Sequence, residues 1–354
     1  MTVFPVVIAI PARNEVELLP QCLAALAGQT GIDPARFAVV ASCNNCTDGT
    51  AAAIHQMILP FALQVDEVSL PADIAHAGGA RRAAMDAAAG LCGDDGIVVT
   101  TDADGVPASD WVAATVAAFV PGIAAVAGRV STDWDQLSQF PADVLDVGAR
   151  EWDYQLLSAE LDAYGDPEPH DLWPRHNQTC GANMAITRDW YGRIGGLPVL
   201  RTGEDGAMFD AVRHRDGLIR HDMASHVTVS ARLVGRAQGG MADALSLRHG
   251  DAYECDDLLE PADDLLRRAT WRHRARAAYQ AGVLTHWAAQ VGIAPMLALR
   301  AAVCDTFGAA WAALETAEPR LAKHRLTAAA LDTELARIRT LRAKLPAVPQ
   351  GLAA

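Results

Sequence analysis

Short apolar runs alternate with amphipathic segments along the first 130 residues of the chain. The apolar runs predict buried strands, and the segments whose apolar positions recur every three or four residues predict helices. The expected strands cover residues 6–10, 37–41, 63–68, 97–101 and 124–130. The expected helices start near Val16, Asp48, Gly78 and Ser109. This alternation is typical of an α/β fold in which a mostly parallel sheet carries helices on both faces.

The pattern becomes irregular over residues 131–174, which are rich in Asp and Trp. Turn-forming residues at 165–169 interrupt it further, and we interpret the stretch as an insertion that covers a functional site. Regular structure is expected again as a strand at 181–186, a helix from Glu204 to about Arg215 and a strand-like stretch at 225–233.

The chain beyond about residue 241 reads as helical and rich in alanine. An apolar stripe near its end comprises Leu331, Leu335, Ile338, Leu341 and Leu345. We expect this stripe to pack onto the rest of the chain, with a homodimer contact as the alternative. Five arginines between residues 267 and 276 indicate a solvated helix face, with binding of a phosphorylated acceptor or an anionic lipid as the alternative.

The 354 residues carry a formal net charge of −14, and 51% of them are apolar. Such a chain can bury a sizeable core. Its acidity argues against nucleic acid as the main partner, because phosphate backbones need a basic face. A nucleotide ligand remains compatible, since a bound cation can reverse the local field. Residues 277–299 carry no charge but include Gly, Pro, Gln and His, so we expect buried helices there, with membrane contact as the less favoured alternative.

Seven cysteines, an odd number, are scattered along the chain. No secretory signal precedes the first strand, so a reducing cytoplasm is the expected location. Cys43 and Cys46 have the spacing of a zinc or redox pair, but no second pair follows, which argues against zinc. We expect these two thiols to serve packing and the turn, with a redox role as the alternative.

Asp102 and Asp104 stand in the segment 100–105, which directly follows the apolar run of residues 96–99. They therefore stand at the carboxyl end of an expected strand, where open α/β sheets bind ligands. Two carboxylates one residue apart in a turn can face one divalent cation, which takes its other ligands from water and phosphate. The pair points to a substrate that carries a metal-bound diphosphate.

Two further polar loops follow strands at the same edge, residues 11–15 and 42–50. Their amide and carboxylate side chains can hydrogen-bond a heterocycle and a ribose; turn formation alone is the competing explanation. His76-Ala77-Gly78-Gly79-Ala80-Arg81-Arg82 begins a helix, and its small residues let backbone N–H groups approach an anion. The loop at 230–240 has three glycines and two arginines, Arg232 and Arg236, a composition that suits a lid clamping a diphosphate. A plain surface loop is the alternative there.

The order of these motifs resembles the family 2 glycosyltransferases, which have a GT-A fold. The motifs are Ile-Pro-Ala-Arg-Asn-Glu, Asn-Asn-Cys-Thr-Asp-Gly-Thr, Gly-Gly-Ala-Arg-Arg, Thr-Asp-Ala-Asp and Gly-Glu-Asp. The resemblance covers roughly residues 4–240 and implies a GT-A domain at 1–240 with a Rossmann-like sheet. Its donor half would span about 1–130 and its acceptor-side insertion about 131–180, followed by a helical extension at 241–354.

The resemblance also implies roles for individual residues. Those expected to bind the donor nucleotide and its diphosphate are Pro11, Ala12, Glu15, Asn45, Asp48, Gly79, Arg81, Asp102, Arg232 and Arg236. Asn45 stands where many members carry an aspartate, which leaves the base less certain. Asp104 would ligate a divalent cation, Mn²⁺ or Mg²⁺, together with Asp102 and His226; His221 is the alternative histidine, and in a third reading both histidines are ordinary packed or surface residues. Asp205, next to Glu204, would be the catalytic base.

The expected activity is a metal-dependent, inverting transfer of a hexose from a nucleotide diphosphate sugar, most simply a UDP-sugar, to an acceptor hydroxyl. Such an acceptor needs a base within about 3 Å, and a cation stabilises the leaving diphosphate. One alternative is a retaining transferase that resembles glucosyl-3-phosphoglycerate synthase. Others are a nucleotidyltransferase, which would need a glycine- and lysine-rich loop at 11–15, and a non-catalytic nucleotide-sugar binding protein.

Overall fold

The computed structural model describes residues 3–233, 235, 255–256 and 258–348. Contacts divide the chain into two compact units. The first contains residues 1–140, 178–212 and 218–247, and the second contains residues 141–177, 213–217 and 248–354. This division assigns residues 141–177, expected as an acceptor-side insertion, to the same unit as the C-terminal helices.

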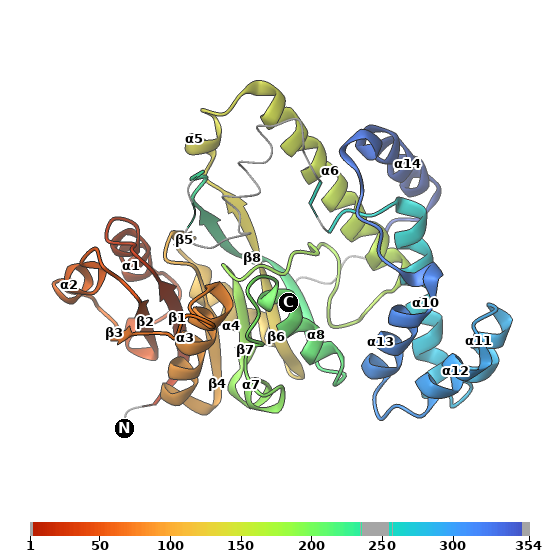
Figure 1. Cartoon of the computed structure of the whole chain (residues 1–354), viewed down its shortest axis with the longest axis horizontal. Coiled ribbons are helices and arrows are strands. Elements are labelled where there is room, and N and C mark those ends of the chain that lie inside the picture. Colours follow the sequence, from red (N-terminus) through yellow and green to blue (C-terminus); the bar gives the residue numbers. More distant parts are fainter. Residues whose placement is uncertain (1–2, 234, 236–254, 257, 349–354) are drawn as a thin grey trace. The chain divides into compact units, whose positions relative to one another are not determined.

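The first unit is built on a mixed sheet of eight strands within the described residues (Figure 1). Its order is β3-β2-β1-β4-β7-β6-β8-β5. The strands are β1 (Phe4–Ala12), β2 (Phe37–Asn44), β3 (Ala62–Val68), β4 (Cys92–Thr100), β5 (Gly105–Pro107), β6 (Ile123–Thr132), β7 (Met184–Thr187) and β8 (Leu218–Val229). The helices are α1 (Leu19–Ala27), α2 (Thr50–His55), α3 (Ala77–Leu91), α4 (Trp111–Ala118), α5 (Trp134–Leu137), α7 (Arg188–Arg193) and α8 (Glu204–Arg213).

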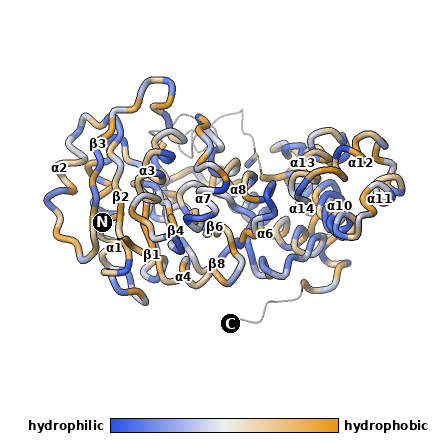
Figure 2. Tube along the Cα trace, turned by 90° about the horizontal axis from the view of Figure 1, so that it is seen from below, coloured by the Kyte–Doolittle hydropathy of each residue, from blue (hydrophilic) through white to orange (hydrophobic). Residues whose placement is uncertain are grey.

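Alternating side chains of the central strand β1 enter two separate cores. Ile8 and Ile10 pack in a cluster with Leu23 of α1, whereas Val7 packs in a second cluster with Met85 of α3. Successive strand residues point to opposite faces of the sheet. Since one set packs against α1 and the other against α3, helices bury both faces of the sheet. Figure 2 shows the resulting hydrophobic stretches along these strands. The predicted α/β class, with helices on both faces, is confirmed.

Parallel pairing dominates the amino-terminal half of the sheet. Strands β3, β2, β1 and β4 are mutually parallel, while β7 lies antiparallel between β4 and β6. The carboxyl ends of β1, β2 and β4 therefore meet at one edge. The loops that follow them begin at residues 13, 45 and 101, so the three polar loops expected from the sequence do share an edge.

The second unit is helical in its described part. Its helices are α6 (Ala142–Gly165), α10 (Ala262–Gln280), α11 (Leu284–Gln290), α12 (Pro295–Ala302), α13 (Phe307–Ala317) and α14 (Leu331–Lys344). Leu331, Leu335 and Ile338 of the C-terminal stripe share a core with Tyr154 and Leu161 of α6. The stripe thus packs within its own unit, in line with the first of the two expectations; a homodimer contact stays a prediction.

Residues 142–165 were expected to be irregular, and they form the 24-residue helix α6 instead. Its apolar face, which includes the fully buried Tyr154 and Leu161, is narrow. The many polar residues around that face therefore masked the helical periodicity in the sequence.

The uncharged stretch at 277–299 is helical, as expected, but only in part buried. Met296 and Leu299 of α12 are exposed. Among the described residues, the helices are all too short or too polar to cross a bilayer.

The solvated face expected from the sequence is only partly correct: Arg274 is exposed, but three other arginines of α10 pair inside the unit. Arg268 is buried and pairs with Glu260. Arg272 and Arg276 both bind the carboxylate of Asp166, which has no exposed surface. Arg272 also contacts Asp162, at 3.0 Å. Burial of these carboxylates requires compensating charge, and the arginine run supplies it.

We expect Asp166→Asn to lower the free energy of unfolding by about 3–5 kcal/mol, because two half-buried guanidinium groups lose the fully buried carboxylate that they share. Burial opposes ionisation of Asp166, but the arginines prevail and lower its pKa. A lowered folded pKa adds stability above about pH 4, and that stability is lost as the pH falls further. Urea unfolding across that range should therefore show a weaker pH dependence in the variant. Asp305→Asn, at an exposed site, is the control; equal stability of the two variants would contradict the prediction.

Candidate functional site

The loops after β1 and β2 are joined by hydrogen bonds into one scaffold. The amide of Glu15 donates to Oγ1 of Thr50 at 2.9 Å, and the amide of Val16 donates to Oδ2 of Asp48 at 3.1 Å. Oδ1 of Asn14 accepts from the amide of Thr47 at 2.8 Å. Asp48 thus orders the first loop as well as the start of α2. Such cross-links hold both loops in a defined shape at the sheet edge.

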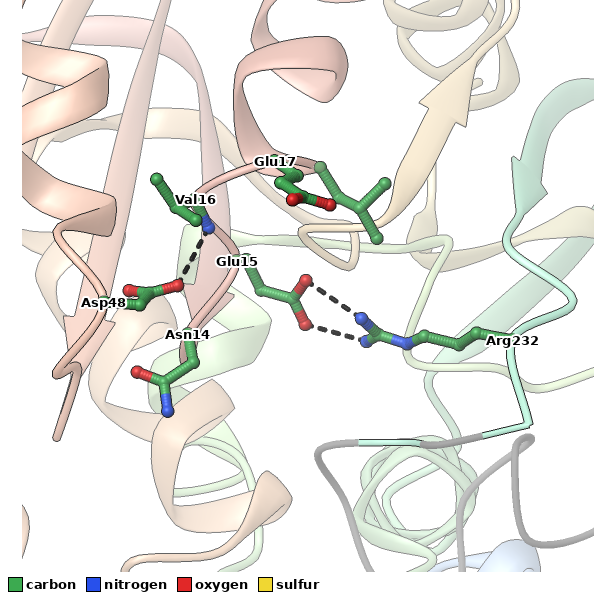
Figure 3. Close-up of a pocket in the computed structure, with 7 residues that line it drawn as sticks. Asn14, Glu15, Val16, Glu17, Asp48 and Arg232 are labelled. Carbon is green, nitrogen blue, oxygen red and sulfur yellow. Dashed lines mark hydrogen bonds and ion pairs between the residues drawn. The ribbon is translucent and has the colours of Figure 1, made fainter.

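A cavity of about 570 Å³ opens beside this scaffold. Its lining consists of Asn14, Glu15, Val16, Glu17, Leu18, Asp48 and Arg232. Figure 3 shows the guanidinium of Arg232 facing the carboxylate of Glu15. The volume lies in the range of small-molecule sites. Three residues expected at the donor site, Glu15, Asp48 and Arg232, are therefore brought together.

Three other expected donor residues lie beside the cavity lining rather than in it. Ala12 is buried at the end of β1, and its carbonyl accepts from Nδ2 of Asn44 at 2.8 Å. Pro11 precedes it in the same strand. The side chain of Asn45 pairs with the backbone of Leu70 through both its oxygen and its nitrogen. Their contribution to a nucleotide pocket stays a prediction.

Asp102 and Asp104 follow β4, and each contacts a different arginine. Oδ1 of Asp102 lies 2.8 Å from Nη2 of Arg81, and Oδ2 of Asp104 lies 3.1 Å from Nη2 of Arg232. Burial raises the pKa of Asp104 to about 6, with Asp102 and Glu15 acting in the same direction and Arg232 opposing them. Crowded, partly buried carboxylates of this kind fit a divalent cation, whose charge would offset their repulsion.

Arg81 connects the carboxylate of Asp102 to the start of α8. It is 6% exposed, and all three of its nitrogens donate hydrogen bonds. Nε bonds Glu204 at 3.1 Å, Nη1 bonds the carbonyl of Gly181 at 2.7 Å, and Nη2 bonds Asp102. The guanidinium is thus engaged inside the protein. Its expected contact with a diphosphate stays a prediction.

The carboxylate of Asp205 is fixed by two backbone amides. Oδ2 accepts from Gly181 at 3.0 Å and Oδ1 accepts from Gly206 at 2.8 Å. The side chain is half-buried at the start of α8, and lone pairs of both oxygens remain available. Glu204, in contrast, is buried against Arg81. Of the two expected catalytic carboxylates, Asp205 is the more exposed, and its role as the base stays a prediction.

Gly181 is a site residue that sequence reasoning missed as such. Its amide binds Asp205 and its carbonyl binds Arg81. A Cβ there would lie 2.6 Å from Cζ of Arg81, so any larger residue requires the guanidinium to move. The small residues Gly181 and Ala182 before a strand were the only indication in the sequence, and they are equally typical of close packing in a core.

Three expected site residues are not joined to this arrangement. Nε2 of His226 lies 2.7 Å from Oγ of Ser131, and burial with Arg129 lowers the pKa of the imidazole. Among the described residues, no three His, Cys, Asp or Glu side chains are grouped to hold a metal, so metal ligation by His226 stays a prediction. The amide of Gly79 donates to Nδ1 of His76, capping α3. Arg236 lies outside the described residues.

Replacing Gly181 with alanine should push Arg81 away from Asp102 and Glu204. We expect the free energy of unfolding to fall by about 3 kcal/mol, because buried charges then lose their partners. Gly90→Ala, in α3 with open space around it, is the matched control and should be neutral or slightly stabilising. Thermal unfolding of both variants checks this; a Gly181→Ala variant as stable as the control would mean that Arg81 is not confined as described.

Residues 7–175 match the family model described as glycosyl transferase family 2. A comparison with curated proteins finds no significant match. Among solved structures, the chain is similar to the mannosyltransferase PcManGT from Pyrobaculum calidifontis in complex with GDP-Man and Mn²⁺. The identity is 18%, with 97% of this chain and 87% of that chain covered and a TM-score of 0.49.

Two further structures show similar overlaps. TarS 1–349 from S. aureus in complex with UDP-GlcNAc is 12% identical, with 89% of this chain and 92% of that chain covered and a TM-score of 0.48. Glucosyl-3-phosphoglycerate synthase from Mycobacterium tuberculosis, with Mn²⁺, UDP and phosphoglyceric acid, is 21% identical over 69% and 78% at a TM-score of 0.38. Because all three TM-scores are below 0.5, the assignment rests on the family match. The match to glycosyl transferase family 2 over residues 7–175, just under half of the chain, identifies that stretch as a glycosyltransferase domain.

Proposed function

We propose that this chain transfers a hexose from a UDP-sugar to an acceptor hydroxyl, with a divalent cation, Mn²⁺ or Mg²⁺, and with inversion at the anomeric carbon. The observation that carries the proposal is the hydrogen-bonded path from Asp102 through Arg81 and Gly181 to Asp205. It holds a candidate metal ligand and a candidate base in one network. The family assignment supplies the reaction class.

The donor lies, in this proposal, in the cavity lined by Glu15 and Asp48, with its diphosphate toward Asp104. Asp104 and Asp102 hold the divalent cation, which when bound supplies Lewis-acid stabilisation of the charge on the leaving β-phosphate. Arg81 keeps Asp102 in place, and Glu204 keeps Arg81 in place. These residues therefore orient the leaving group before the acceptor arrives.

Asp205 accepts the proton of the acceptor hydroxyl as that oxygen attacks the anomeric carbon. The amides of Gly181 and Gly206 stabilise its negative charge and fix its direction. Attack from the face opposite the diphosphate gives inversion. We further propose a cytoplasmic enzyme without a nucleic-acid partner; the net charge of −14 supports the second point.

If Asp104 ligates the cation, Asp104→Asn should abolish the metal-dependent part of UDP binding. Removal of one of two carboxylate ligands leaves the cation with too few oxygen donors from the protein. Isothermal titration calorimetry with UDP, with and without Mn²⁺, measures this. Asp110→Asn, an exposed aspartate six residues on, should bind as the wild type does. Unchanged, metal-dependent affinity in Asp104→Asn would remove the basis of the proposal.

If Asp205 is the base, Asp205→Asn should reduce kcat by about 10²- to 10⁴-fold while the affinity for UDP stays near that of the wild type. Glu204→Gln should behave differently and weaken UDP binding, because it releases Arg81 from its partner. Steady-state kinetics and calorimetry on both variants separate the two roles. NMR of the wild-type product reports the anomer, and retention would overturn the inverting mechanism.

A further inference from the structure

Arg232 reaches two acidic side chains that come from two different loops of the sheet edge. It stands three residues after the end of β8. Its Nη1 and Nη2 bind the two oxygens of Glu15 at 2.9 and 2.7 Å, and Nη2 also lies 3.1 Å from Oδ2 of Asp104. The fork of the guanidinium matches a carboxylate in two parallel bonds. Figure 3 shows the pairing with Glu15.

The backbone that carries Arg232 is also held. Oε1 of Gln136, in the short helix α5, accepts from the hydroxyl of Ser230 and from the amide of Ala231, both at 2.9 Å. The amide of Arg232 in turn donates to Oγ of Ser230 at 3.2 Å. The position of the arginine over Asp104 is therefore determined from both ends, by its backbone and by its side chain.

The guanidinium supplies the counter-charge in a crowded acidic region. Asp102, Asp104 and Glu15 contribute three carboxylates, and Arg81 already serves Asp102. A cation on Asp104 would lie about 2 Å from the carboxylate oxygen that Arg232 now contacts. Two positive charges about 4 Å apart repel each other, and the repulsion is stronger beside the largely buried side chain of Asp104 than in bulk water. Simultaneous binding of both to that oxygen is therefore unfavourable.

We propose that Arg232 is an internal counter-cation that competes with the divalent cation for Asp104, and that the donor diphosphate relieves the competition by giving Arg232 a new anion. The inference rests on the proposed role of Asp104 as a metal ligand. It makes the binding of cation and nucleotide mutually dependent: each binds weakly alone, and each strengthens the other. A coupling of this kind keeps an empty site from filling with cation.

The test is a titration of the nucleotide-free enzyme with Mn²⁺, followed by the EPR signal of free Mn²⁺. Arg232→Gln should bind Mn²⁺ about tenfold more tightly than the wild type, within the usual range of such couplings. Arg232→Lys keeps the positive charge and should stay near the wild type. With UDP present, the gain in Mn²⁺ affinity that UDP produces should be smaller in Arg232→Gln than in the wild type. Equal or weaker Mn²⁺ binding by Arg232→Gln would overturn the inference.

A second variant guards against misfolding of the first. Gln136 is exposed, and Gln136→Ala loosens the segment of Ser230 and Ala231 without touching the carboxylates. It should raise Mn²⁺ affinity in the same direction, though less, and an unchanged affinity would count against the inference. Asp104→Asn in the same titration separates the two ideas. If it binds Mn²⁺ like the wild type, the proposed metal site is wrong; if it alone loses binding while Arg232→Gln is unchanged, only the competition is wrong.

Discussion

The candidate site depends on the hydrogen bonds and ion pairs that the buried guanidinium of Arg81 makes. The guanidinium joins the end of β4, the start of α8 and the backbone at Gly181. An arginine that is 6% exposed is tolerated only when its charge and its donors are satisfied. The ion pairs also fix the carboxylates, because Asp102 and Glu204 must stay within hydrogen-bonding distance of the buried guanidinium. The distance between the candidate metal ligand and the candidate base is thereby set by one buried cation.

The two arginines of the site, Arg81 and Arg232, differ in their exposure to solvent, and the difference fits their roles. The side chain of Arg81 is 7% exposed, whereas that of Arg232 is 25% exposed and rests on a segment held by Gln136. An ion pair that remains accessible to solvent can exchange one anion for another, since water compensates the charges during the exchange. Arg81 is therefore suited to a permanent structural role, and Arg232 is suited to a contact that changes when a ligand arrives.

Internal pairing of arginine recurs in the helical unit. Arg268, Arg272 and Arg276 of α10 bind Glu260, Asp162 and Asp166, and the last of these is completely buried. In a chain with 43 acidic and 29 basic residues, counter-charges are scarce, and many of the arginines are used inside the fold. A run of arginines in an acidic protein is for that reason a poor indicator of an anion-binding surface.

The sequence by itself determined the strands β1, β2 and β4, because a buried strand appears in the sequence as a continuous apolar run. It also placed Asp102 and Asp104 at a strand end, and the order of five short motifs indicated the glycosyltransferase family. The tertiary structure alone decided which side chains meet. Glu15 and Arg232 are 217 positions apart, Arg81 and Glu204 are 123 apart, and Gly181 matters only because a guanidinium lies against it. Periodicity is local information, whereas charge pairing depends on which distant elements the folded sheet brings to one edge. The helix α6 was not predicted for a related reason. Its narrow apolar face can be recognised as a buried face only when the distant helices that pack on it are known.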